Sequence, residues 1–180
     1  MTAVLVVCTA NICRSPMAAA LLVHHLEAAG SSTRVHSAGT HALPNDVASD
    51  SVAVMADRGI DIAGHSPRLL ARDDVHWADV IVTMEAAHVA HVVALDSAAF
   101  GKTFCARELV QRAERLGPRR GDETLADYLA RLHTGRRAAD VLRAASELDI
   151  SDPIGQSREA FETSAKELDE LMEAVAEIVR

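Results

Sequence analysis

A cysteine and an arginine, Cys8 and Arg14, stand at the two ends of one short segment and together could bind and attack an oxyanion. The apolar run 3–7 precedes the segment and predicts a buried strand, while Ser15 can cap a helix whose first turn suits Pro16. In such a strand–loop–helix, backbone N–H groups and the helix N-terminus direct positive charge inward. We therefore expect Cys8 to be a nucleophile and Arg14 to bind two oxygens of the same anion.

The position of this pair carries more weight than its spacing, because a chain rich in arginine produces the spacing by chance. Cys8 follows directly on the apolar run, so it lies at the carboxyl end of the expected strand, where open α/β sheets bind ligands. The alternative is a buried strand cysteine followed by an unrelated, solvated arginine.

The elements that must position this pair alternate along the chain between short apolar runs and segments of helical periodicity. Strands are expected at 3–7, 34–37, 79–84 and 102–106, and helices at 15–29, 46–58, 85–95 and the C-terminus. The alternation predicts an α/β fold, a doubly wound four-stranded parallel sheet with helices on both faces. We expect residues 1–180 to form a single domain.

Five segments of the chain, in order, resemble the low-molecular-weight protein tyrosine phosphatase family. They read VVCTANICRSPMA around Cys8, SAGT at 37–40, DIAGHSPR at 61–68, DVIVTM at 79–84 and DISDPIG at 149–155. The resemblance implies a phosphatase that forms a phosphocysteine intermediate on Cys8. It assigns catalysis to Cys8, Arg14 and Asp152, and phosphate binding to the whole loop: Thr9, Ala10, Asn11, Ile12, Cys13, Arg14 and Ser15.

Asp152 is the expected general acid and base of this reaction. Pro153 restricts the backbone of Asp152 to extended conformations. The carboxyl group would protonate the leaving oxygen and then activate the water that hydrolyses phosphocysteine. From the residues alone, Asp152 is equally well a turn former before proline. The resemblance favours catalysis, because the family carries an Asp-Pro loop before its last helix.

The resemblance also implies a network that supports the phosphate loop, made of Asn11, Ser15, Ser37 and His65. Asn11 suits a strained loop because asparagine tolerates left-handed backbone conformations. Ser37 as an ordinary strand-end residue and His65 as a satisfied loop histidine remain alternatives. Cys13 either fills the underside of the loop as a small apolar group or, as the resemblance implies, is the redox partner of Cys8 in a reversible disulfide.

Ala10 and two loop segments depart from the family pattern, so the sequence does not decide which phosphorylated side chain is the substrate. Ala10 replaces the usual glycine, and neither segment 41–44 nor segment 154–155 offers an aromatic ring to stack on a phenol. The Asp-Pro-x-Gly pattern is similar to the bacterial arginine-phosphatase branch, whereas Ile12 suits tyrosine-directed members better than that branch's threonine. Phosphotyrosine is the favoured substrate and phosphoarginine the alternative, with Ile12, Leu43 and Ile154 as the expected walls of the site.

Composition narrows the remaining classes. A net charge of −8 argues against nucleic acid as the main partner, and no segment is long and apolar enough for a membrane span or a signal peptide. Three cysteines without metal-ligand spacing suit a reducing cytoplasm, and the paired histidines at 24–25 and 88–91 lack an accompanying ligand pattern. We therefore expect a cytoplasmic protein without metal or cofactor, whose partner is a phosphorylated protein or a small phosphomonoester.

Residues 116–148, here called the insert, have no counterpart that we recognise in the family resemblance. The surrounding stretch 105–145 holds nine of the 18 basic residues and six acidic ones. Two short helices are expected, at 122–131 and about 137–145, joined by residues 133–135. The favoured interpretation is an amphipathic insert with solvated arginines, and the alternative is a basic surface, including Arg119, Arg120, Arg136 and Arg137, that docks an anionic partner.

Two other functions share the same loop. An oxyanion reductase such as an arsenate reductase would relay electrons through Cys13 or Cys105. A non-enzymatic module that binds phosphate groups would have no use for Asp152. Only the phosphatase needs Cys8, Arg14 and Asp152 together.

Overall fold

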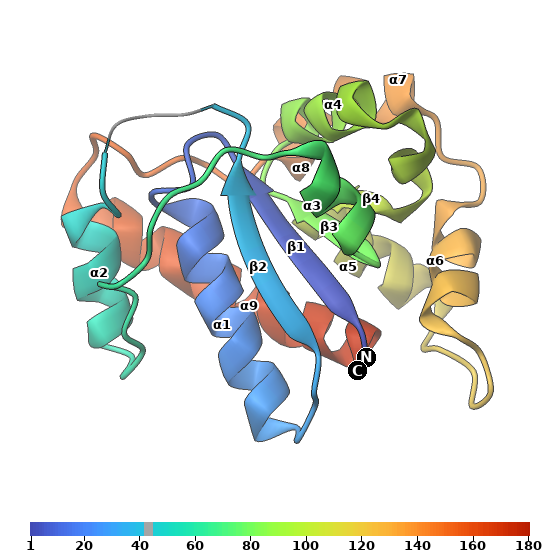
Figure 1. Ribbon diagram of the computed structural model, residues 1–180, viewed down its shortest axis with the longest axis horizontal. Coiled ribbons are helices and arrows are strands. Elements are labelled where there is room, and N and C mark those ends of the chain that lie inside the picture. The colour runs from blue at the N-terminus through green and yellow to red at the C-terminus, as the bar shows by residue number, and fades with distance from the viewer. Residues whose placement is uncertain (42–44) are drawn as a thin grey trace.

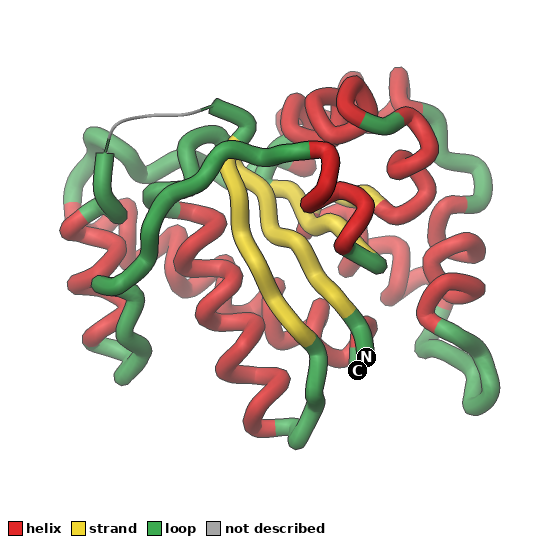
Figure 2. Tube along the Cα trace, viewed as in Figure 1, coloured by secondary structure: helices red, strands yellow, loops and turns green. Residues whose placement is uncertain are grey.

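The computed structural model describes residues 1–41 and 45–180. Its centre is one sheet of four parallel strands in the order β2-β1-β3-β4. The strands are β1 (Ala3–Cys8), β2 (Arg34–Gly39), β3 (Val80–Thr83) and β4 (Thr103–Cys105). This confirms the predicted fold class, and Figures 1 and 2 show the strands with helices packed around them.

Helices follow or precede each strand, as the alternating pattern predicted. They are α1 (Arg14–Ala28), α2 (Ser49–Ala56), α3 (Arg72–Trp77), α4 (Ala86–Leu95), the 3₁₀ helix η1 (Ser97–Lys102), α5 (Ala106–Leu116), α6 (Leu125–His133), α7 (Ala138–Arg143), α8 (Ala145–Leu148) and α9 (Arg158–Val179).

Strand β1 lies in the middle of the sheet and every residue in it is buried. Its side chains alternate between two faces, as the twofold period of a strand requires. Val4, Val6 and Cys8 join the core that contains α1 and α9, while Leu5 and Val7 join a second core with residues of α3 and α4. Burial on both faces explains why β1 is a continuous apolar run.

Helix α9 covers the same face of the sheet as α1 (Figure 1). An apolar stripe along α9 is buried in the larger core: Phe161, Leu168, Met172, Val175 and Val179. Helix α9 thereby fixes the position of the loop that precedes it, which carries Asp152.

The sheet order places the end of β1 at a topological switch point. Strand β1 pairs with β2 on one side and with β3 on the other, so the crossover connections leave in opposite directions. Loops from several parts of the chain gather at this end of the strands (Figure 2). The Cys8–Ser15 loop therefore lies where a ligand site is expected in this architecture.

Some boundaries differ from those predicted. Helix α2 begins at Ser49 instead of residue 46, because Ala48 is extended and donates its N–H to the Ile12 carbonyl at 2.8 Å. Helices α3, η1 and α5 were not predicted, since α3 and η1 have only six residues each and the expected strand at 102–106 ran into the start of α5. The predicted wall residue Leu43 lies outside the described residues.

The insert is helical, as predicted, and contains α6, α7 and α8. Its arginines are not all solvated, however. Arg136 is buried against Phe104 and forms an ion pair with Glu108 of α5. Arg131 binds Glu123, whereas Arg137 and Arg143 are exposed. Arg136 therefore belongs to the core of the insert, and a basic docking surface cannot include it.

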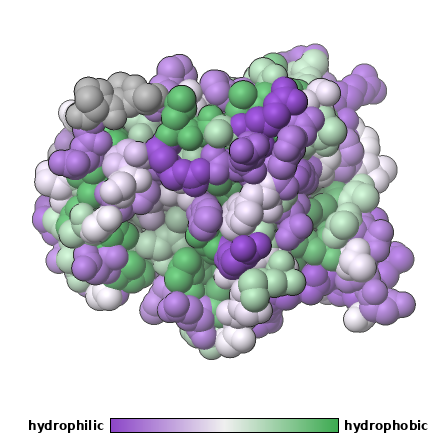
Figure 3. Space-filling view, viewed as in Figure 1, coloured by the Kyte–Doolittle hydropathy of each residue, from purple (hydrophilic) through white to green (hydrophobic). Residues whose placement is uncertain are grey.

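Among the described residues, no helix is long and apolar enough to cross a membrane. On the face shown in Figure 3, hydrophilic residues are interspersed with smaller apolar areas.

Candidate active site

The Cys8 thiol lies at the floor of the loop and is almost completely buried. Its Sγ atom is 2.9 Å from the Ser15 hydroxyl and 3.2 Å from the Asn11 backbone nitrogen, which donates to it. Both contacts can donate hydrogen bonds to a thiolate, the nucleophilic form of cysteine. Ser15 lies in the first turn of α1 and does not cap it as predicted, because the helix begins at Arg14. The start of the helix directs its positive end toward this loop.

Asn11 holds the loop in its curled form. It has a φ of 57° and is the only non-glycine residue with positive φ in the described parts of the chain. Its buried side-chain nitrogen donates to the hydroxyls of Ser15, at 2.8 Å, and Ser37, at 2.9 Å. The His65 ring nitrogen Nε2 is 2.9 Å from the Asn11 carbonyl. The structure thus brings together all four residues of the predicted support network.

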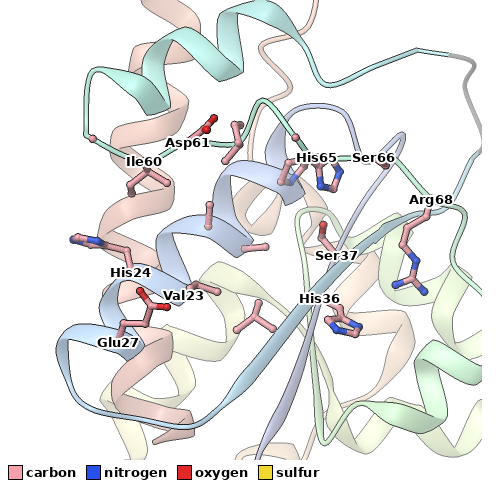
Figure 4. Close-up of a pocket in the computed structure, with 17 residues that line it drawn as sticks. Val23, His24, Glu27, His36, Ser37, Ile60, Asp61, His65, Ser66 and Arg68 are labelled. Atoms are coloured by element: carbon pink, nitrogen blue, oxygen red, sulfur yellow. The ribbon is translucent and has the colours of Figure 1, made fainter.

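Ser37 and His65 contact the loop at Asn11, and both also line a cavity of about 820 Å³ (Figure 4). Ser37 comes from β2 and His65 from the segment that follows α2. The next part of that segment contributes the Arg68 N–H, which donates to the Asn11 side-chain oxygen at 3.1 Å. Two segments far from the loop in sequence, β2 and residues 65–68, therefore fix one strained asparagine.

Gly39 allows the end of β2 to pack directly on the loop backbone. A Cβ atom at this position would lie 2.8 Å from the Thr9 oxygen and the Ala10 carbonyl carbon, which is closer than real contacts allow. The Gly in the SAGT segment is thus explained by this close approach. Ala10 itself has a negative φ, so its methyl group is compatible with the loop.

Arg14 is buried and reaches out of α1 toward two carboxylates. Its Nη1 donates to Glu85 and to the Ile150 carbonyl, and its Nη2 donates to Asp152 at 2.5 Å and to the Thr9 hydroxyl at 3.3 Å. Burial acts to lower the pKa of Arg14, but the hydrogen bond to Glu85 and the negative charges of Asp152, Glu85 and Cys8 outweigh it and raise that pKa. The guanidinium is therefore a permanent cation beside Cys8.

Asp152 lies in the loop before α9, 138 residues from Arg14 in sequence. Its second carboxylate oxygen accepts the Ile154 N–H at 3.1 Å, and Pro153 beside it is buried. The Asp152 side chain is 40% exposed, so one edge of the carboxylate faces solvent. The fold thus brings the predicted acid to the predicted phosphate-binding arginine.

Glu85 and His88 were not singled out for this site from the sequence. Glu85 contacts Arg14, and the His88 ring nitrogen Nε2 lies 3.0 Å from the Thr9 hydroxyl. Burial lowers the pKa of His88 to about 4. Their position directly after β3, at the carboxyl edge of the sheet beside β1, was the available signal.

The remaining predicted residues divide between core and surface. Ile12 is buried in the main core, whereas Ile154 is exposed. Cys13 is buried, and that burial raises the pKa of its thiol to about 12. Cys8, Cys13 and Cys105 are all unpaired. Within residues 1–41 and 45–180, no cluster of three His, Cys, Asp or Glu side chains is suited to hold a metal ion.

A thiol, a buried guanidinium and an aspartate thus meet at one switch point of a parallel α/β sheet, an arrangement suited to binding an oxyanion. The comparisons with known proteins identify the class as phosphatases. The family model "Low molecular weight phosphotyrosine protein phosphatase" matches residues 3–124. The chain therefore belongs to the low-molecular-weight phosphotyrosine protein phosphatase family.

Two curated relatives illustrate the range within this family. The low molecular weight protein-tyrosine-phosphatase Etp of Escherichia coli K12 is 34% identical over 70% of this chain and 83% of its own length. A protein-arginine-phosphatase of Geobacillus stearothermophilus is 29% identical over 97% of this chain and 93% of its own. The second alignment extends beyond residue 124 and includes most of the insert.

A solved structure agrees over nearly the whole chain. The low molecular weight protein tyrosine phosphatase from T. tengcongensis superimposes with a TM-score of 0.73 at 27% identity, covering 97% of each chain.

Proposed function

We propose that this protein hydrolyses phosphorylated side chains of proteins through a phosphocysteine intermediate. The observation that carries the proposal is the meeting of Cys8, Arg14 and Asp152 at one end of the sheet. Arg14 links the other two groups, since it shares the loop with Cys8 and donates to Asp152. Each of these residues then has a role that its chemistry suits.

In the first step, the Cys8 thiolate attacks phosphorus and the bond to the leaving oxygen breaks. The phosphoryl group takes the place of the carboxylates on the Arg14 fork, and the loop N–H groups bind its equatorial oxygens. Asp152, released from Arg14 and partly exposed, gives its proton to the leaving oxygen. The products are phosphocysteine and the dephosphorylated side chain.

In the second step, the Asp152 carboxylate accepts a proton from water while the water oxygen attacks phosphorus. The sulfur–phosphorus bond breaks, inorganic phosphate leaves and the thiolate is restored. The hydrogen bonds of Ser15 and Asn11 to the Cys8 sulfur stabilise the thiolate as a leaving group.

Phosphotyrosine is the substrate we favour. Relatives such as Etp are named as tyrosine phosphatases, and the exposed Ile154 supplies apolar surface in the loop that carries Asp152. Phosphoarginine is the second candidate, and one observation favours it. Glu85 and Asp152 are both partly exposed and both bind the Arg14 guanidinium, so they could equally bind a guanidinium of the substrate. The relative that aligns over 97% of this chain is named as an arginine phosphatase.

The test of the mechanism uses a small aryl phosphate. We expect steady hydrolysis by the wild type, none by Cys8→Ser, and a kcat about 100-fold lower for Asp152→Asn. Turnover of arsenate with thiols but not of aryl phosphate would favour the reductase. Phosphate binding without hydrolysis of any phosphorylated peptide would favour the binding module.

The test of the substrate compares kcat/KM for phosphotyrosine, phosphoarginine and phosphoserine peptides of one sequence. A tenfold or larger preference for phosphoarginine would overturn phosphotyrosine and leave the mechanism intact.

Two further expectations belong to this proposal. Three unpaired cysteines support a reducing environment such as the cytoplasm. Cys13 is proposed to bridge Cys8 under oxidation, which would protect the nucleophile from irreversible loss.

A further inference from the structure

His88 is a buried histidine that the proposed reaction does not use. It lies in the first turn of α4 with only 3% of its surface exposed. Its Nε2 is 3.0 Å from the hydroxyl of Thr9, the residue directly after the nucleophile. Its other ring nitrogen, Nδ1, is buried and has no hydrogen-bond partner among the described residues. A buried histidine in which only one ring nitrogen is hydrogen-bonded requires an explanation.

Burial keeps the His88 ring neutral, because the charges around it act in both directions. Glu85 and Asp152 act to raise the pKa of His88, and Arg14 and His91 act to lower it. Burial is the largest influence and brings this pKa to about 4. Near neutral pH, one ring nitrogen therefore carries a hydrogen and the other is a bare acceptor.

The surroundings indicate which nitrogen carries the hydrogen. If Nδ1 carried it, an N–H group would be buried without an acceptor, an arrangement that is rare in native proteins. Nε2, in contrast, faces the Thr9 oxygen and lies 3.9 Å from the Glu85 carboxylate. An N–H at Nε2 meets an acceptor and a negative charge. The hydrogen therefore belongs on Nε2.

This tautomer fixes the direction of the Thr9 hydroxyl. The oxygen of a hydroxyl has two acceptor positions and one hydrogen to donate. Arg14 Nη2 donates to this oxygen at 3.3 Å, and His88 Nε2 donates to it as well. With both acceptor positions taken, the hydroxyl hydrogen is left for a third partner.

We infer that His88 is a positioning residue that orients the Thr9 hydroxyl to donate a hydrogen bond to an oxygen of the bound phosphoryl group. Arg14 would approach the same phosphoryl group, because Thr9 and Arg14 are already joined. The inference rests on the proposed function and adds a side-chain donor to the loop N–H groups. The ligand it recognises is a tetrahedral oxyanion, whichever side chain carries it.

The test combines two removals with one conservative replacement. Thr9→Val and His88→Leu should each lower kcat/KM for an aryl phosphate about tenfold, and each should weaken competitive inhibition by inorganic phosphate to a similar degree. The double variant should lose no more than either single one, since both remove the same donor. His88→Gln keeps an N–H at the end of the side chain and should remain within threefold of the wild type.

His91→Leu is the matched control, because His91 lies on the same helix and its ring faces that of His41, with the two centroids 6.1 Å apart. It should leave kcat/KM unchanged. Additive losses in the double variant, or unaltered phosphate inhibition in Thr9→Val, would show that the pair only packs. If His88→Leu does not fold, Thr9→Val and His88→Gln decide the question.

A measurement on the wild type is independent of these variants. Nitrogen-15 NMR of the His88 ring should show a neutral imidazole protonated at Nε2 from pH 5 to 8. A hydrogen on Nδ1, or titration of the ring within that range, would overturn the inference. An inactive wild type with this same NMR signature would count against the proposed function and not against the orientation of Thr9.

Discussion

Two buried arginines in this molecule bind carboxylates in opposite ways. Arg136 of the insert is sealed: its side chain is fully buried, and its partner Glu108 is 8% exposed. Arg14 of the phosphate loop is equally buried, but its partners are open, since Glu85 is 27% and Asp152 40% exposed. One arginine is enclosed together with its partners, and the other faces partners that a ligand can replace.

The contacts of Arg136 leave none of its hydrogen-bond donors free for a ligand. Its nitrogens reach both oxygens of Glu108, the carbonyls of Phe100 and Thr103, and the His133 ring, while Phe104 covers its face at 4.0 Å. Every guanidinium N–H therefore has an acceptor. A buried arginine alone does not indicate a functional site. The exposure of its partners is the more informative quantity.

The largest expected effect comes from replacing the fork of Arg14. Arg14→Lys keeps the charge but cannot grip two phosphoryl oxygens at once, so kcat/KM for an aryl phosphate should fall about 1000-fold. The free energy of unfolding, measured with urea, should fall by no more than about 2 kcal/mol because the ion pairs persist. A variant that keeps most of its activity would contradict the role of Arg14.

The reverse pattern is expected for Arg136. Arg136→Met leaves Glu108 buried with only the 3.3 Å contact to Arg112, so the free energy of unfolding should fall by about 3–5 kcal/mol. Adding Glu108→Leu should restore part of the loss, because the unpaired charge is gone. The folded fraction should keep its kcat/KM. Loss of activity in a variant that is still fully folded would mean that the insert contributes to the site.

Phosphate should stabilise one of these variants and not the other. Inorganic phosphate at 100 times its Kd should raise the free energy of unfolding of the wild type by about 2.7 kcal/mol. Arg136→Met should show the same increase from its lower baseline, and Arg14→Lys should show almost none. The measurement is thermal or urea unfolding with and without phosphate. Equal protection of both variants would place the phosphate site away from Arg14.

Local patterns in the sequence predicted most of the fold. The apolar run of β1 and the stripe of α9 depend on burial by a sheet, and short-range periodicity reports that burial directly. Helices α3 and η1 were not predicted because one or two helical turns leave too little periodicity to detect. The start of α2 was predicted incorrectly because it depends on a hydrogen bond to Ile12, which is distant in sequence.

The site was predictable only in part for a related reason. Cys8, Arg14 and Asp152 lie in motifs whose chemistry is visible in the residues, helped by the family resemblance. Glu85 and His88 are ordinary residues at the start of a helix, and they acquire roles only from their contacts with Arg14 and Thr9. The burial of Arg136 was likewise not predictable, since nothing in its local sequence distinguishes it from its solvated neighbour Arg137.

In the proposed mechanism, the phosphoryl group is transferred from the substrate to the sulfur of Cys8 before it is hydrolysed. This transfer is tested most directly by mixing the Asp152→Asn variant with an aryl phosphate, quenching within the first turnover and locating the added phosphoryl group by mass spectrometry. We expect one phosphoryl group on Cys8, formed together with a burst of phenol and absent from Cys8→Ala. A phosphoryl group on any other residue, or hydrolysis by Cys8→Ala at the wild-type rate, would contradict this mechanism.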